Sequence, residues 1–374
     1  MHNRTLINRI ITTPEEFAAS RECWNELVGD RLFHRWEWMY SWWEQLGGAG
    51  ELAIVVVQDL SGAWVGLAPW YKARSASRGR VISALGNGLA CSDYVSVVAV
   101  EGMEEFVSEE LLKVMSSGHP LFANVDLIEI EGHLANDPVV EALRVCASDS
   151  FGGNVQEVIG GAWKTKLPSS WDDFQRALRQ SFRRKTKRAM RRLTSGECES
   201  NLFVSGEEIN QAWPDFVDLH QRRRRSLGQP GCFSDPSFSA FLKAATLRLA
   251  ESGRAHINMV SHQGRPLACN LGFSAGDTIY LYQTGVDPER MDLEPGHINS
   301  CSVINATIEH SFTCFDFLRG DEPYKRFWNA ERTELYRTRF VPNKLSSNLR
   351  YSLVNAGRSL RNWAAQAKGC QEQG

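Results

Sequence analysis

Three side chains in the second half of the sequence have the types that acid–base catalysis needs: Asp316, Tyr282 and Tyr324. Asp316 stands between two phenylalanines in a predicted strand. A carboxylate in apolar surroundings has a raised pKa, which suits a general base near neutral pH. Tyr282 ends an alternating aromatic strand, and we predict that it faces a cleft as the general acid, with Tyr324 as the alternative acid. A buried structural acceptor is the alternative role for Asp316.

A second group of residues could hold an anion. A helix should begin where the polar loop 287–295 ends, and the first N–H groups of a helix are free to bind an anion. The residues predicted to do so are Gly296, His297 and Ile298, with Lys325 and Arg184 as the cations that balance the charge. The alternative is an ordinary strand–helix–strand crossover followed by a solvated turn.

The predicted helix 171–193 is unusually basic. Ser170 and Asp173 form a capping-box pattern at its start, and no acidic residue occurs from 175 to 194. Like charges at helical spacing repel each other, so the concentration of arginine and lysine between Arg183 and Arg192 indicates an anionic partner. The candidates are the phosphates of a nucleotide cofactor, an anionic saccharide or lipid headgroup, and RNA; a solvated face is the alternative.

Four residues are predicted to bind an acceptor substrate. Asp93 and Tyr94 lie in a loop of the first half and could face the second half across a cleft. Trp38 belongs to a tryptophan-rich helix, residues 33–46, that could form a pocket wall. Arg319 follows the strand that contains Asp316. The alternatives are a loop cap before a strand for the first two residues and core packing for Trp38.

The elements that would position these residues alternate between strands and helices, which predicts an α/β fold. From residue 256 to residue 318 the order is strand, turn, strand, turn, strand, loop, helix and strand. Loops after the carboxyl ends of strands are where α/β proteins place their chemistry. Residues 54–69 and 257–273 share a pattern of two apolar strands around a glycine-containing turn, which suggests a duplicated fold.

Size and composition exclude several classes of protein. With 374 residues, 43% of them hydrophobic, the chain can bury a large core, and we expect two domains. A formal net charge of −2 excludes a generally basic nucleic-acid binder, and no DNA partner is expected. Nine cysteines and nine histidines lack metal-ligand spacing, so we expect no metal. The longest apolar run, residues 52–57, is too short to cross a bilayer and no signal peptide is recognised, so we expect a cytoplasmic protein that is not transmembrane.

Several short motifs resemble one known family. In the second half they are GRPLA at 264–268, YQTGVD at 282–287, PG at 295–296 and FDFLRGDEPYK at 315–325. In the first half they are the tryptophan-rich segment 36–43, GLAP at 66–69, LG at 85–86 and SDY at 92–94, followed by the basic helix 182–193. Over residues 33–332 the chain resembles the BioF2-like GNAT acetyltransferase domain of the cellulose-biosynthesis CelD family, which is similar to the FemAB peptidoglycan transferases.

The resemblance implies two GNAT-like units side by side, with mixed, mostly antiparallel sheets flanked by helices. It implies a unit without cofactor over residues 1–160, a unit with the acyl-CoA site over residues 161–345, and a helical tail over residues 346–374. The implied activity is transfer of an acyl group from acyl-CoA to an amine, and acetyl is the acyl group expected. An amino sugar or a cell-envelope or exopolysaccharide precursor is the implied acceptor.

Two alternative functions stay open. An aminoacyl-tRNA-dependent, FemAB-like transferase would use the basic helix to bind RNA. A non-catalytic accessory protein of polysaccharide biosynthesis is favoured by the loop 292–297, which has one glycine where the GNAT pattern has two. For the localisation, the alternative to a freely diffusing cytoplasmic protein is a cytoplasmic protein bound peripherally to the inner face of the membrane.

Overall fold

The structure is a computed structural model that describes residues 5–147, 151–345 and 347–352. Two sheets form its framework: a four-stranded sheet of order β1-β3-β4-β7 and an eleven-stranded sheet of order β10-β11-β12-β13-β14-β9-β15-β8-β6-β5-β2. Among the described strands, only β13 with β14 and β6 with β8 pair in parallel. The prediction of a mixed, mostly antiparallel α/β fold is therefore confirmed.

The described residues of the first half form strands β1 to β8 and helices α1 to α5. They are β1 (Ile7–Ile11), α1 (Pro14–Ala19), α2 (Arg21–Val28), α3 (Trp36–Leu46), β2 (Glu51–Leu52), β3 (Ile54–Gln58), β4 (Trp64–Ala68), β5 (Trp70–Ser75), β6 (Gly79–Ala84), β7 (Val98–Ala99), α4 (Glu104–Ser116), β8 (Leu127–Leu134) and α5 (Pro138–Cys146). Short 3-10 turns cover Leu32–His34 and Gly88–Ala90.

The second half continues with the remaining strands and helices. They are β9 (Phe151–Lys166), α6 (Trp171–Ala177), α7 (Gln180–Thr194), β10 (Cys198–Phe203), α8 (Gly206–Ser226), α9 (Pro236–Ala250), β11 (Ala255–His262), β12 (Arg265–Ala275), β13 (Thr278–Val286), α10 (Pro295–Glu309), β14 (Cys314–Arg319) and β15 (Glu331–Pro342). Further 3-10 turns are Cys232–Ser234, Pro288–Leu293 and η5 (Pro323–Trp328).

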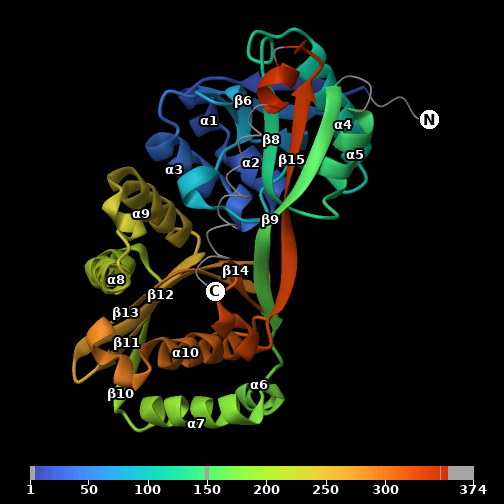
Figure 1. The fold of residues 1–374 in the computed structure, drawn as a ribbon. Coiled ribbons are helices and arrows are strands. Elements are labelled where there is room, and N and C mark those ends of the chain that lie inside the picture. The colour runs from blue at the N-terminus through green and yellow to red at the C-terminus, as the bar shows by residue number, and fades with distance from the viewer. Residues whose placement is uncertain (1–4, 148–150, 346, 353–374) are drawn as a thin grey trace, which may run out of the picture.

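Two long strands join the halves. β9 and β15 pair with each other along most of their length and run from the N-terminal half into the C-terminal half (Figure 1). β9 crosses the predicted domain boundary at residue 160 without a break. The buried Arg339 of β15 donates from Nε to Glu129 Oε2 of β8 at 2.7 Å, and its Nη1 lies 2.9 Å from Glu157 Oε1 of β9.

The prediction of one helix over residues 171–193 is wrong. Leu178 has extended φ and ψ angles of −70° and 151° and separates α6 from α7. Its side chain is 1% exposed, and burying it turns the backbone out of the helix. The guanidinium of Arg183 donates to the carbonyl oxygens of Arg176 and Leu178, which satisfies the open end of α6. The predicted tail, residues 346–374, lies almost wholly outside the described residues.

The C-terminal sheet is covered on both faces. α10 lies on one face with α6 and α7 outside it, while α8 and α9 cover the other face (Figure 1). Side chains of β13 alternate between these faces: Ile279 and Leu281 belong to the core beneath α10, whereas Tyr280 and Tyr282 pack against the core shared with the N-terminal half. One face of β13 therefore packs against α10, and the other packs against the core shared with the N-terminal half.

β13 and β14 diverge along their length. Their parallel pairing covers only three residue pairs and ends at Tyr280 with Asp316. In the same region β12 and β13 shift register, because Gln283 pairs with Leu271 and Leu281 pairs with Gly272, which leaves Tyr282 as an extra residue. Beyond Tyr280, β13 therefore stays paired with β12 but no longer pairs with β14, and this break in pairing is the gap between β13 and β14.

Candidate active site

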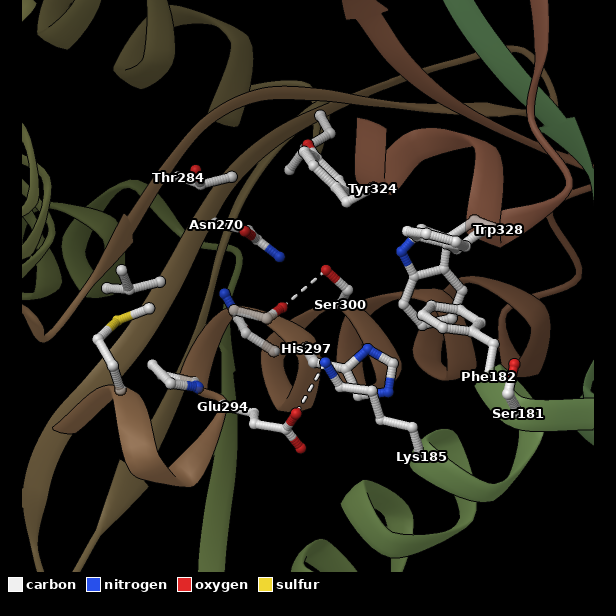
Figure 2. Close-up of a pocket in the computed structure, with 17 residues that line it drawn as sticks. Ser181, Phe182, Lys185, Asn270, Thr284, Glu294, His297, Ser300, Tyr324 and Trp328 are labelled. Carbon is white, nitrogen blue, oxygen red and sulfur yellow. Dashed lines mark hydrogen bonds and ion pairs between the residues drawn. The ribbon is translucent and has the colours of Figure 1, made fainter. Parts of the chain in front are cut away.

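A cavity of about 730 Å³ opens on the α10 face of the C-terminal sheet. α7, β12, β13, the start of α10 and η5 supply its lining (Figure 2). The apolar lining residues are Phe182, Leu281, Val286, Met291, Pro295, Phe327 and Trp328. The polar ones include Asn270, Thr284, Asn299, Ser300 and Tyr324. A long, mostly apolar ligand with a few polar groups fits such a lining.

The start of α10 lies beside two cations at this cavity. Glu294 is the N-cap residue, with a φ of 58°, and Figure 2 shows its carboxylate pointing to Lys185. The Lys185 Nζ lies 2.8 Å from Glu294, and Arg188 Nη2 lies 2.5 Å from it. Burial alone would raise the pKa of Glu294, but these two cations hold that pKa below its ordinary value. Two positive charges against one negative charge leave this corner net positive.

Three helix-start amides were predicted to hold an anion, and two of them have partners. The N–H groups of His297 and Ile298 donate to the carbonyl oxygen of Glu294 at 3.0 and 3.2 Å. The N–H of Gly296 has no acceptor among the described residues. Gly296 and His297 line the cavity, while Ile298 is 1% exposed and belongs to the core.

The imidazole of His297 is part of an aromatic wall. Its ring stacks on Trp328 with centroids 5.3 Å apart and meets Phe182 edge-on at 4.9 Å. Burial, with Lys185 nearby, lowers the pKa of His297 to about 4. The ring is therefore neutral at physiological pH and contributes apolar surface rather than charge.

A polar row crosses the sheet beneath α10. Asn258 of β11 pairs in register with Asn270 of β12, which pairs with Thr284 of β13, so the three side chains share one face. Asn258 is fully engaged, since its Nδ2 donates to Asn299 of α10 at 2.7 Å. Asn270 is 2% exposed, lines the cavity, and its Nδ2 has no acceptor among the described residues. Sequence reasoning missed this residue; asparagines at matching positions of successive strands were the available signal.

Two predicted cations do not lie in the cavity lining. The Nζ of Lys325 is buried and donates to the carbonyl oxygens of Leu318, Arg319 and Gly320 at 3.1, 3.0 and 2.9 Å. It therefore stabilises the turn that follows β14. Arg184 is exposed on α7. Lys185, one position later, is the α7 cation that lines the cavity.

On the opposite face, predicted residues from the two halves meet. Tyr94 donates its phenol O–H to Asp316 Oδ2 at 2.7 Å, and the N–H of Leu318 donates to Asp316 Oδ1 at 2.8 Å. Asp93 accepts from both the backbone N–H and the guanidinium of Arg319. A loop of the first half thus holds the end of β14 through two neighbouring residues.

Burial sets the charge state of this pair. Asp316 is 3% exposed, and burial raises its pKa to about 6, although the hydrogen bonds from Tyr94 and Leu318 oppose the change. Burial and the Asp316 carboxylate raise the pKa of Tyr94 far above its ordinary value. The phenol therefore keeps its proton while Asp316 changes charge near neutral pH.

A second cavity, of about 250 Å³, lies on this face between the two halves. Tyr94 and Tyr280 line it together with Asp93 and the segment 30–34. Tyr282 and Trp38 are not in its lining: Tyr282 donates its phenol O–H to the carbonyl oxygen of Ala90 at 2.8 Å. The Trp38 ring, 0% exposed, meets the Tyr282 ring edge-on at 5.2 Å. Both residues pack in the core between the halves.

Comparison with known proteins indicates a class for the second half. Residues 180–326 match the family model described as acetyltransferase (GNAT) domain. This segment contains α7, β12, β13 and the start of α10, which supply most of the lining of the larger cavity. No curated protein sequence matches the chain.

Solved structures extend the likeness to both halves. The fold is similar to that of FemX, with a TM-score of 0.63, 13% identity, and coverage of 92% of this chain and 99% of that chain. A conserved protein of unknown function from Bacteroides thetaiotaomicron has a TM-score of 0.56 at 11% identity, covering 90% and 100%. L-PGS from Bacillus licheniformis has a TM-score of 0.53 at 11% identity, covering 92% and 96%. At these identities the likeness is one of fold, and the prediction of two GNAT-like units is confirmed.

Among the described residues, no helix combines the length and the apolar character that crossing a bilayer requires.

Proposed function

We propose that this protein is an N-acyltransferase that moves an acyl group from acyl-CoA to an amine. The observation that carries the proposal is a pair of cavities, of about 730 and 250 Å³, on opposite faces of the sheet where β13 and β14 diverge. A donor in the larger cavity and an acceptor in the smaller one would meet at the gap between the strands. Such an arrangement holds two reactants in one orientation and lowers the entropic part of the barrier.

The start of α10 suits the pyrophosphate of the donor. A Cβ atom built on Gly296 meets nothing closer than Val286 Cγ1 at 3.5 Å, so the backbone there is open to the cavity. The free N–H of Gly296, the helix N-terminus and the positive corner at Lys185 and Arg188 would all attract phosphate oxygens. The apolar wall at Phe182 and Trp328 would cover the rest of the donor.

In the proposed reaction, residues on one face of the sheet remove the proton of the amine, and a residue on the other face protonates the leaving thiolate. The amine attacks the thioester carbon, and its proton passes to Tyr94 as the Tyr94 proton passes to Asp316. The C–S bond then breaks, and the thiolate takes a proton from Tyr324, which lines the donor cavity and whose pKa is raised by burial. Tyr324 replaces Tyr282 in this role, because the Tyr282 phenol is engaged in the core. The resemblance to the CelD family favours an amino sugar or a cell-envelope precursor as the acceptor.

An aminoacyl-tRNA donor is the second candidate. The fold similarity to FemX supports it, and so does the outer surface of α7. Arg184, Lys187 and Arg191 are exposed there, and no acidic residue within the described ranges pairs with them. RNA phosphates would bind such a surface in a salt-dependent way.

Replacing Gly296 with valine tests the proposed donor site. We expect Gly296→Val to raise the Kd for acetyl-CoA by about 10-fold or more, because its γ-methyl groups would occupy the space of the pyrophosphate. Gly206→Val is the matched control: Gly206 also lies in the first turn of a helix, and nothing lies within 4 Å of a Cβ there. Isothermal titration with acetyl-CoA and longer acyl-CoAs measures the Kd.

The same titrations separate the two candidates. Wild-type protein that releases no heat with any acyl-CoA would overturn the acyl-CoA proposal. Binding of aminoacyl-tRNA whose salt dependence weakens in Arg184→Ala would then support the second candidate.

A further inference from the structure

Asn270 is an unusual residue in the wall of the larger cavity. The Nδ2 of its carboxamide is buried and has no hydrogen-bond acceptor among the described residues, and Asn270 is only 2% exposed. Figure 2 shows the side chain reaching into the cavity beside Thr284. A buried polar group without a partner costs stability, so a residue of this kind points to a ligand.

The neighbouring Asn258 supplies a direct contrast. It occupies the register-matched position on β11, is 1% exposed, and has partners on both atoms of its amide. Its Nδ2 donates to Asn299 at 2.7 Å, and its Oδ1 accepts from Ser200 at 3.2 Å. Of two asparagines on one face of the same sheet, Asn258 thus has a partner for its Nδ2, whereas the Nδ2 of Asn270, beside the cavity, has none among the described residues.

The place of Asn270 along the cavity identifies the part of the donor that it meets. At one end of the cavity the open backbone of Gly296 would hold phosphate. At the other end lies the gap between β13 and β14, where Leu281 also lines the wall. Asn270 is on β12, paired with Thr284 of β13, and stands between the two ends. A donor that spans the cavity would pass its middle section over this carboxamide.

We propose that Asn270 binds a secondary amide in the arm of the acyl donor. A carboxamide offers one donor and one acceptor side by side, which matches the C=O and N–H of a secondary amide. The arm of acyl-CoA carries two secondary amides, whereas the ester that links an amino acid to tRNA carries none. Asn270 therefore selects amide-bearing thioester donors. The inference rests on the proposed function and deepens it by naming the donor group that is recognised.

Stability measurements compare the two asparagines. Asn270→Leu removes an unpaired buried amide at nearly constant volume, so we expect a higher Tm for the unliganded protein. Asn258→Leu breaks a satisfied network and should lower the Tm. A decrease in Asn270→Leu similar to that in Asn258→Leu would indicate a structural role for Asn270 and overturn the proposal.

Binding measurements then pair the protein change with a ligand change. The probes are acetyl-CoA and two analogues in which one arm amide or the other is replaced by an ester, which keeps C=O and removes N–H. Wild-type protein should bind one of the analogues about 10-fold more weakly than acetyl-CoA, which is the value of one hydrogen bond. Asn270→Leu should bind that analogue and acetyl-CoA with the same Kd. Asn270→Ala repeats the test if the leucine variant does not fold.

The outcomes distinguish the inference from the proposed function. If acetyl-CoA binds to wild-type protein but each ester analogue loses the same affinity in wild type and variant, the assignment of Asn270 is wrong and the transferase proposal stands. If acetyl-CoA does not bind to wild-type protein, the proposed function itself fails.

Discussion

Asp316→Asn is expected to lower kcat/KM for acyl transfer by about 100-fold to 10,000-fold, the usual contribution of a general base. Asparagine keeps the size of the side chain, but it cannot take the proton that Tyr94 passes on. The loss should appear in kcat rather than in KM, because Asp316 lines neither cavity. Initial rates with acetyl-CoA and a series of amines measure it.

The pH profile carries a second signature of Asp316. Since burial raises the pKa of Asp316 to about 6, wild-type activity should rise as pH increases through about 6, and this rise should be absent from the residual activity of Asp316→Asn.

The free energy of unfolding of the wild type should depend on pH in the opposite direction and decrease as pH rises. The folded-state pKa is above the ordinary value of 3.8, so between about pH 4 and 6 the folded chain binds more protons than the unfolded chain. The wild type should therefore gain on the order of 3 kcal/mol relative to Asp316→Asn as pH falls from 7 to 4.

Asp59→Asn is the control for the activity and stability experiments on Asp316→Asn, since Asp59 lies in an exposed turn before β4 and accepts hydrogen bonds that asparagine can also accept.

Tyr94→Phe should reproduce most of the activity loss of Asp316→Asn, because it removes the phenol that links the amine to Asp316. Asp316→Asn with wild-type kcat at pH 8 would show that the carboxylate is structural.

Glu129→Ala should lower the free energy of unfolding by about 3–5 kcal/mol, the typical cost of leaving one partner of a buried ion pair alone. The side chains of Glu129 and Arg339 are 4% and 2% exposed, and their Oε2 and Nε atoms lie 2.7 Å apart. Without Glu129, the Arg339 guanidinium retains Glu157, which is 38% exposed. The Nη2 of Arg339 already has no partner among the described residues. Urea unfolding monitored by circular dichroism measures the change.

The surface pair of Asp30 with Arg254 supplies the control, because the Asp30 side chain is 61% exposed and Asp30→Ala should cost less than about 1 kcal/mol. The double variant Glu129→Leu with Arg339→Met should regain much of the loss, since it removes both charges and fills the space with apolar atoms. Equal losses in Glu129→Ala and Asp30→Ala would contradict the assignment of a costly buried charge.

Local patterns in the sequence predicted the order of elements around the site. Alternating apolar residues indicated β11, β12 and β13, and the proline with glycine after the polar loop indicated the start of α10. The setting of Asp316 between two phenylalanines indicated a buried carboxylate. These signals work because strand and helix periodicity and helix-start chemistry are local properties.

Contacts between distant segments could not be predicted in the same way. Tyr94 and Asp316 are 222 positions apart, and only the packing of the two halves brings them together. Lys325 was interpreted as a phosphate-binding cation. In the structure its ammonium donates hydrogen bonds to three carbonyl oxygens of the turn after β14. Leu178 interrupts the basic helix for a tertiary reason, the burial of its side chain, that helix propensity does not contain.

Because β9 and β15 each contribute hydrogen bonds in both halves, we expect that neither half folds as a separate module. A truncation at residue 160 would divide β9 and remove from the N-terminal half the strand β15 that completes its sheet, so isolated halves should be insoluble or unfolded. Within the described residues, β9 and β15 connect the halves as continuous strands, so we expect little rotation of one half against the other. We therefore expect Tyr94 and Asp316 to stay together, so that a substrate would reach Tyr94 through the opening of the smaller cavity rather than by domain closure.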